Sequence, residues 1–228
     1  ADICIAHDLW CHVDAAYGGF FILLDELKAR FKGIKKSDSV VLDPHKSMFL
    51  PYGTGTVLVR DKKYLLTSYD YEANYMQDAD AFAHHISPAD VSPELTKHFR
   101  GMRMWLPLQL HSLKAFKACL REKVLLTRYF YDEIQKLGFE VGAYPELSVM
   151  TYRYVPKFGD ADAFNKKLVD MIRIDGTVFV SSTNLEGKFV IRLAVLSFRT
   201  HLDTIDTLLA QFKKFVSVLE TESEFVTP

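Results

Sequence analysis

The alternation of apolar runs and polar breaks predicts short strands and helices in the first part of the chain. Apolar runs bounded by turn residues indicate strands at Cys11 to Ala15, Ser39 to Leu42 and Thr56 to Arg60. Ile3 to Leu9 is predicted to be the tail of a helix, and Phe20 to Phe31 is predicted to be helical in part. Short strands that alternate with helices favour an α/β fold with a mainly parallel sheet.

A long helix is predicted over Trp105 to Leu137. Apolar residues recur there at spacings near three and four, and Lys and Arg fall largely off that stripe. Gly138 is a plausible end for such a helix. We interpret the apolar stripe as part of a core rather than as a partner-binding face.

The remainder of the chain is predicted to form a small α+β domain. Its last helix runs to about Leu219 and opens at Thr200 to Asp203, which resembles an N-terminal capping arrangement with Asp in place of Glu. The other predicted elements are a strand at Leu147 to Tyr154, a helix at Ala161 to Ile174, and a hairpin of Thr177 to Ser181 with Lys188 to Val195 across Asn184-Leu185-Glu186-Gly187.

The segment from Thr67 to Pro93 shows no strong periodicity. It is polar, and it is too long to be a simple connection in a compact domain. Two interpretations are open, a poorly ordered surface excursion and a mobile active-site lid.

Candidate chemistry lies at the ends of two predicted strands. Asp43-Pro44-His45-Lys46 follows one strand, and an open α/β sheet binds its ligands at such strand ends. A poorly hydrated lysine there has a lowered pKa and can act as a nucleophile toward an aldehyde. Asp14 ends the other strand and is followed by small residues that allow close approach. A reactive lysine and an acid for a ring nitrogen are the minimum set for a pyridoxal phosphate (PLP) enzyme.

Two motifs carry a resemblance to a known family. His12-Val13-Asp14-Ala15-Ala16-Tyr17-Gly18-Gly19 and Asp43-Pro44-His45-Lys46 resemble the group II PLP-dependent amino acid decarboxylases, which include aromatic amino acid, glutamate and diaminobutyrate decarboxylases. Either motif alone is weak, whereas the two in this order are specific. The resemblance continues through His98 to Trp105 and Gly187 to Leu193, so it covers nearly the whole chain.

The resemblance implies the PLP-dependent transferase fold (fold type I), PLP as cofactor, and a set of cofactor contacts. Lys46 would form the Schiff base, and Asp14 would pair with the pyridinium nitrogen. Ala16 would pack under the ring, His45 would lie near the phosphate and the lysine, and Asp43 belongs to the same cofactor-binding set. The alternatives are an ordinary surface lysine, a solvated or capping aspartate and a structural histidine.

The resemblance also implies residues that act on the substrate. Tyr75 is predicted to donate a proton after carbon dioxide leaves, with Tyr69 and Tyr71 as rivals. Arg100 matches the family arginine that follows the lid. The family usually shows Arg-Arg-Phe-Arg where this chain has Lys97 to Arg100, and glycine or tryptophan is common where this chain has Ser47.

The implied activity is α-decarboxylation of an L-amino acid to the amine and carbon dioxide. Alternatives are an aldehyde synthase or a carbon–carbon lyase of the same fold, and a non-catalytic fragment that acts only with a partner chain. Family subunits form homodimers with the active site at the interface. The pattern does not identify the substrate amino acid.

The length of the chain and the resemblance suggest how it divides into domains. The 228 residues allow two modest domains. We expect residues 1–104 to be the C-terminal part of the PLP-binding domain, including a mobile loop over 67–93, and residues 105–228 to form the linking helix and the small domain. By resemblance, an N-terminal portion of the subunit would precede Ala1 and supply the aromatic residue stacked on PLP and much of the phosphate site.

Charge and cysteine usage limit the partners. The formal net charge of −1 gives no electrostatic reason to expect nucleic acid or an anionic membrane. Cys4, Cys11 and Cys119 match no zinc spacing and fit a reducing compartment, so no metal site and a cytoplasmic location are predicted. Apolar runs stay short of a membrane span.

Overall fold

The computed structural model describes residues 1–68, 86–222 and 225, and these residues fall into two compact units. The first unit is Ala1–Lys114 and the second is Ala115–Pro228. The division therefore lies inside a long helix, further along the chain than the expected division after residue 104. Tyr69, Tyr71 and Tyr75 lie outside the described residues.

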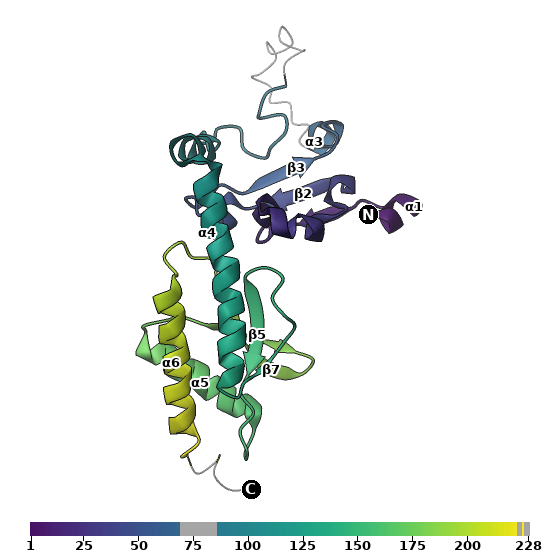
Figure 1. Cartoon of the computed structure of the whole chain (residues 1–228). Coiled ribbons are helices and arrows are strands. Elements are labelled where there is room, and N and C mark those ends of the chain that lie inside the picture. The colour runs from purple at the N-terminus through teal and green to yellow at the C-terminus, as the bar shows by residue number, and fades with distance from the viewer. Residues whose placement is uncertain (69–85, 223–224, 226–228) are drawn as a thin grey trace. The chain divides into compact units, whose positions relative to one another are not determined.

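The N-terminal unit contains a three-stranded sheet in the order β1 (His12–Asp14), β2 (Ser39–Leu42) and β3 (Thr56–Val59) (Figure 1). All three predicted strands are present. β1 and β2 pair in parallel, whereas β2 and β3 pair antiparallel, so this sheet is mixed rather than mainly parallel. The connection between β2 and β3 holds only the one-turn helix Pro44–Ser47 and not the longer helix that usually links parallel strands.

Short helices surround this sheet. The segment from Phe20 to Phe31, predicted to be helical in part, forms two 3₁₀ helices anchored by Phe21 and Leu24, whose side chains are fully buried. Thr67 and Ser68 still belong to a helix, so the segment predicted to be aperiodic begins inside a regular element. The helices are α1 (Asp2–Ala6), η1 (Gly19–Leu23), η2 (Asp25–Phe31), η3 (Ile34–Lys36), α2 (Pro44–Ser47) and α3 (Lys63–Ser68).

The predicted long helix is α4 (Met102–Lys136), which begins three residues earlier than expected. Its backbone is interrupted at Ser112, where φ is 59° and ψ is 159°. The break lies close to the division between the two units.

The C-terminal unit is a four-stranded antiparallel sheet with helices. The strand order is β4 (Glu140–Val141), β5 (Val149–Arg153), β7 (Lys188–Ala194) and β6 (Ser181–Leu185). Helices α5 (Ala161–Asp175) and α6 (Leu202–Leu219) lie beside the C-terminal half of α4 (Figure 1). The predicted small α+β domain is therefore present.

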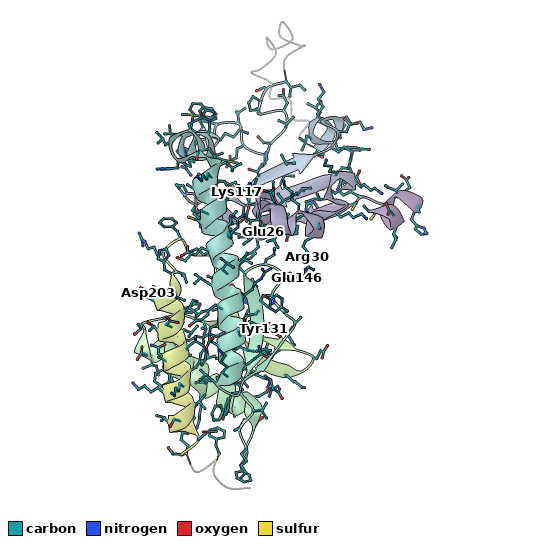
Figure 2. The ribbon with its side chains drawn as sticks, in the orientation of Figure 1. Glu26, Arg30, Lys117, Tyr131, Glu146 and Asp203 are labelled. Carbon is teal, nitrogen blue, oxygen red and sulfur yellow. The ribbon has the colours of Figure 1, made fainter. Side chains whose placement is uncertain are left out.

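An aromatic cluster fills the core of the C-terminal unit. Phe130 of α4, Tyr152 of β5 and Phe212 of α6 are buried, with ring centroids 5.1–6.3 Å apart. Tyr131, labelled in Figure 2, packs edge-on against Tyr144 at 5.1 Å. The apolar stripe of this half of α4 is core, as its periodicity predicts.

The hairpin forms, but its first strand is placed differently from the prediction. β6 is Ser181–Leu185 rather than Thr177 to Ser181. Glu186 and Gly187 both have positive φ, 50° and 77°, which defines a two-residue turn of the primed type. Because such a turn pairs the residues next to it, Leu185 lies opposite Lys188.

The predicted capping arrangement at Thr200 to Asp203 does not form. His201 occupies the N-cap position of α6 without a capping hydrogen bond, and its Nδ1 lies 2.7 Å from Oε1 of Glu122 instead. Asp203, labelled in Figure 2, accepts a hydrogen bond from the backbone N–H of Thr204 at 2.8 Å.

Candidate active site

Lys46 stands on α2, a one-turn helix directly after β2. Asp43 is the N-cap residue and Pro44 takes the first helical position, where the missing N–H of proline costs nothing. The backbone N–H of Lys46 donates to the carbonyl of Asp43 at 2.9 Å. The spacing of three residues returns the two side chains to one face, and Nζ of Lys46 lies 2.7 Å from Oδ2 of Asp43.

Lys46 is partly exposed in this chain. Its side chain is 42% exposed, and its ammonium is paired with a carboxylate whose side chain is 16% exposed. Helix α2 has a single turn, and only its Pro44 and Ser47 are buried. The short helix therefore holds the lysine amine beside the carboxylate of Asp43.

His45 lies on the same turn beside the aspartate. Its Nε2 is 3.8 Å from Oδ2 of Asp43, and its ring packs edge-on against Tyr52 at 5.1 Å. Nδ1 of His45 is buried and has no hydrogen-bond partner among the described residues. Buried polar atoms are normally paired, so this nitrogen has unused capacity to bind a ligand group.

Asp14 closes β1 at the same edge of the sheet. Because β1 and β2 are parallel and Asp14 pairs with Val41, the carboxyl ends of the two strands lie together. The Asp14 carboxylate is exposed, and its Oδ1 accepts a hydrogen bond from the backbone N–H of Ala16 at 3.0 Å. The edge thus carries one paired carboxylate, Asp43, and one exposed carboxylate, Asp14.

Gly19 allows the chain after β1 to approach β2 closely. A Cβ at this position would stand 2.2 Å from Cδ2 of Leu42 and 3.0 Å from Cβ of Ala15. The small residues noted after Asp14 are therefore needed for packing against the strand that leads to Lys46. Ala16 itself is half-buried.

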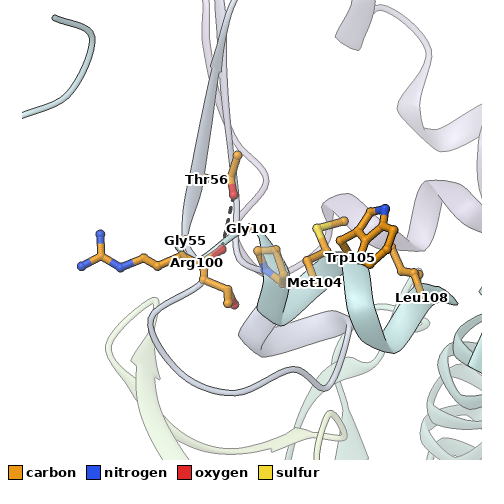
Figure 3. Close-up of a pocket in the computed structure, with 9 residues that line it drawn as sticks. Gly55, Thr56, Arg100, Gly101, Met104, Trp105 and Leu108 are labelled. Carbon is orange, nitrogen blue, oxygen red and sulfur yellow. Dashed lines mark hydrogen bonds between the residues drawn. The ribbon is translucent and has the colours of Figure 1, made fainter. Parts of the chain in front are cut away.

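Arg100 forms a two-point ion pair that its sequence position does not reveal. Its guanidinium contacts Glu94 at 2.5 and 3.0 Å. The hydrogen bond from Arg100 lowers the pKa of Glu94, and the hydrogen bond to Glu94 raises the pKa of Arg100. Figure 3 shows the guanidinium pointing away from Trp105 and Leu108. Glu94 is a partner that the sequence analysis missed, because it lies between the aperiodic segment and the motif that contains Arg100.

An apolar pocket adjoins α2. It has a volume of about 300 Å³ and is lined by Pro44, the Thr54–Thr56 segment, Arg100 and the first turns of α4 (Figure 3). Met104, Trp105 and Leu108 form its apolar wall. The space beside Gly55 is close to the site, since a Cβ there would stand 3.1 Å from Oδ1 of Asp43.

Ser47, which departs from the family pattern, is fully buried. Its Oγ has no hydrogen-bond partner among the described residues. The structure brings Asp43, His45 and Lys46 together on α2 and places Asp14 at the end of the adjacent strand. Arg100 is engaged with Glu94, and Tyr75 lies outside the described residues.

Comparisons with known proteins agree on one family. The family described as "Pyridoxal-dependent decarboxylase conserved domain" matches residues 1–155. An aromatic-L-amino-acid decarboxylase of Bacillus atrophaeus is 32% identical over 93% of this chain and 46% of its own length. An L-2,4-diaminobutyrate decarboxylase of Acinetobacter baumannii is 29% identical over 89% of this chain and 40% of its own length.

A solved structure has a closely similar fold. A crystal structure of Oryza sativa TDC with PLP and tryptamine superposes with a TM-score of 0.89 at 23% identity, over 96% of this chain and 46% of that chain. This likeness establishes the fold, an α/β fold of the PLP-decarboxylase type. The chain spans about half the length of the curated relatives it matches. Among the described residues, no helix is both long and apolar enough to cross a membrane.

Proposed function

This chain belongs to the pyridoxal-dependent decarboxylase family, and we propose that it carries the catalytic lysine of an enzyme that removes the α-carboxyl group of an L-amino acid. The observation that carries the proposal is the placement of Lys46 and Asp14. Asp14 is the last residue of β1, and Lys46 follows the parallel neighbouring strand β2 at the same sheet edge, where α/β folds bind ligands.

The residues at this edge fit PLP. The edge carries an amine, an exposed carboxylate and a buried imidazole nitrogen that has no hydrogen-bond partner among the described residues. These groups supply the three kinds of contact that an aldehyde, a protonated ring nitrogen and a phosphate require. Next to Asp14, Ala16 is a half-buried small residue, and its methyl group leaves room for a planar ring.

When bound, PLP withdraws electrons from the α-carbon of the amino acid, so that the carboxyl group can leave as carbon dioxide. Lys46 would hold the cofactor covalently through Nζ. Asp43 would orient that amine, since it contacts Nζ at 2.7 Å. Asp14 would keep a proton on the ring nitrogen through its negative charge. His45 would offer the phosphate its Nδ1, which has no hydrogen-bond partner among the described residues.

Two further roles complete the proposal. Tyr75 delivers a proton to the carbon that loses the carboxyl group, and this role rests on the resemblance of its segment to the family. Arg100 contacts the substrate or the segment that covers it. Because Arg100 is held by Glu94 through two contacts, it would have to exchange that partner to reach a substrate carboxylate.

We propose that the working enzyme is a cytoplasmic homodimer that includes more of the subunit than these 228 residues. Two observations support this. The chain spans about half the length of its relatives. Before the break at Ser112, α4 also exposes a row of apolar side chains at helical spacing, Met102, Leu106 and Leu110. Such a row is typical of a surface that another polypeptide covers.

The test is a decarboxylase assay on the full-length subunit with PLP and a panel of amino acids. Lys46→Ala and Lys46→Arg should both abolish carbon dioxide release, because neither side chain can hold the cofactor covalently. Lys32→Ala, at an exposed lysine away from the edge, is the matched control and should retain activity. Borohydride reduction and peptide mapping should place the pyridoxyl group on Lys46.

The products separate the alternatives. An amine formed in equal amount to carbon dioxide supports the decarboxylase, whereas aldehyde as the main product identifies an aldehyde synthase. Cleavage of a carbon–carbon bond without carbon dioxide identifies a lyase. If the pyridoxyl group maps to another lysine, or if Lys46→Ala remains active, the proposed site is wrong. Absence of any turnover with bound PLP would favour a non-catalytic role.

A further inference from the structure

A second pocket lies at the opposite end of the β1–β2 pair from Lys46. It has a volume of about 410 Å³ and is lined by Trp10, His12 and Ser39, by Val57 and Val59 of β3, and by α3. His12 and Ser39 are the first residues of β1 and β2 and pair with each other. At the other ends, Asp14 is the last residue of β1 and Asp43 follows β2.

A directed hydrogen-bond chain forms one wall of this pocket. The indole Nε1 of Trp10 lies 2.9 Å from Oγ of Ser39, and Nδ1 of His12 lies 2.7 Å from the same oxygen. An indole nitrogen can only donate, so Ser39 accepts from Trp10. Ser39 is 7% exposed, and among the described residues Nδ1 of His12 is the acceptor within hydrogen-bond distance of its hydroxyl. A buried hydroxyl hydrogen without an acceptor is costly, so Ser39 donates to His12.

The direction of this chain determines which nitrogen of His12 carries the proton. Because Nδ1 accepts from Ser39, the neutral ring holds its hydrogen on Nε2. Nε2 is on the far side of the ring from the buried serine, and His12 is an exposed residue that lines the pocket. His12 therefore provides an Nε2–H donor at the pocket, and the pairing of β1 with β2 fixes the position of this residue.

The other walls are aromatic and aliphatic. Trp10 and Tyr64 meet edge to face at 4.8 Å and are 49% and 44% exposed, and Val57 is 56% exposed. The ammonium of Lys63 lies 4.8 Å from the centroid of the Tyr64 ring and 3.2 Å from Asp61. No carboxylate is among the described residues that line the pocket. This combination suits a planar ring that packs on the aromatic wall and a hydrogen-bond acceptor that reaches His12.

We propose that this pocket is a binding site for a small aromatic carboxylate. The ring packs against Trp10 and Tyr64, and the carboxylate accepts a hydrogen bond from Nε2 of His12. The site lies at the other end of the strand pair from the Lys46 edge: His12 and Asp14 are two residues apart on β1, or about 6.6 Å at roughly 3.3 Å per residue. Neither Asp14 nor Lys46 is among the described residues that line the pocket.

The experiment measures binding by titration calorimetry on the 228-residue chain, with histidine ¹⁵N spectra as a second readout. Phenylacetate is the probe. Benzyl alcohol keeps the ring without the carboxylate, and cyclohexylacetate keeps the carboxylate without the planar ring. Phenylacetate should bind roughly tenfold more tightly than either, because each analogue loses one of the two contacts. Equal affinity for all three, or no saturation by phenylacetate, would overturn the proposal.

Variants test the mechanism of recognition. His12→Phe keeps an aromatic ring without the donor and should weaken phenylacetate binding by roughly tenfold or more. His7→Phe, at an exposed histidine outside the pocket, is the matched control and should bind like the wild type. If His12→Phe binds phenylacetate as tightly as the control does, His12 is not the donor and the proposal is wrong.

The tautomer gives a readout that does not depend on ligand binding. At about pH 8.5, above the usual titration range of histidine, the ¹⁵N shifts of His12 should show hydrogen on Nε2. Trp10→Phe and Ser39→Ala should each produce a mixture of tautomers, because each breaks the directed chain. A wild-type His12 with hydrogen on Nδ1 would remove the donor from the pocket and contradict the inference, whether or not a variant is less stable.

Discussion

Gly19→Ala tests whether the chain is stabilised by the close packing of Gly19 against Leu42, the last residue of the strand that leads to Lys46. The new Cβ would stand 2.2 Å from Cδ2 of Leu42 and 3.0 Å from Cβ of Ala15. Carbon atoms in contact prefer about 3.5–4.0 Å, so the Leu42 side chain would have to move by more than about 1 Å. Leu42 directly precedes Asp43, the residue that contacts the lysine amine.

Two effects of opposite sign set the expected magnitude. Overpacking at a tight contact costs about 1–3 kcal/mol. Alanine also restricts the unfolded chain, which stabilises a compatible position by about 0.4–1 kcal/mol, and Gly19 does not have a positive φ. We therefore expect Gly19→Ala to lower the free energy of unfolding by roughly 0.5–2 kcal/mol.

Urea denaturation of the chain measures this change, and a double-mutant cycle identifies its cause. In a Leu42→Ala background the main clash is gone, so Gly19→Ala should become neutral or stabilising. Gly101→Ala is the control, since its nearest contact is an aromatic carbon of Phe99 at 3.4 Å. If Gly19→Ala is as stable as the wild type while Leu42 is present, the close approach does not constrain this edge.

Four further outcomes are expected. Asp14→Asn should retain some PLP but lose most activity in the full-length subunit, as measured by absorbance and carbon dioxide release, because an amide cannot stabilise a protonated ring nitrogen. Tyr75→Phe should still release carbon dioxide but shift the product from amine to aldehyde, as measured by chromatography. Lys123→Met should destabilise the chain by about 1–3 kcal/mol in urea, because this fully buried ammonium contacts a carboxylate and two backbone carbonyls. Burial raises the pKa of Glu122, but hydrogen bonds from His201 and Lys123 lower it overall below the ordinary 4.5. The stability difference between wild type and Glu122→Gln should therefore be present above about pH 4.5 and disappear as the pH falls through the lowered pKa.

Much of the fold could be predicted because local signals agree with it. The strand at Ser39 to Leu42 is a short apolar run that ends at Asp-Pro, and its bounds match β2. The helix predicted at Ala161 to Ile174 has Asp160 as its N-cap and ends at Gly176 with φ 74°, so capping and periodicity indicate the same limits. The orientation of β3 was not predictable in this way, because an apolar run has no direction.

The features that were wrong depend on partners distant in sequence. His201 pairs with Glu122, 79 residues away, in place of the local capping arrangement. The first hairpin strand was predicted at the apolar residues Thr177 to Ser181, which precede β6. The two-residue turn instead pairs the more polar Ser181–Leu185 with β7.

The parallel register of β1 and β2 determines which side chains meet at each end of this strand pair. His12 and Ser39 are 27 residues apart in sequence, and their pairing brings a histidine, a serine and a tryptophan together at the amino ends. The same register places Asp14 opposite Val41 and so brings its carboxylate to the edge from which α2 projects Lys46. A slip of one residue would turn every side chain of β1 to the other face of the sheet. Such a slip would separate His12 from Ser39 and would also turn Asp14 away from the face of the sheet that it now occupies. The hydrogen bonds at the amino ends therefore stabilise the register on which the geometry at the lysine depends.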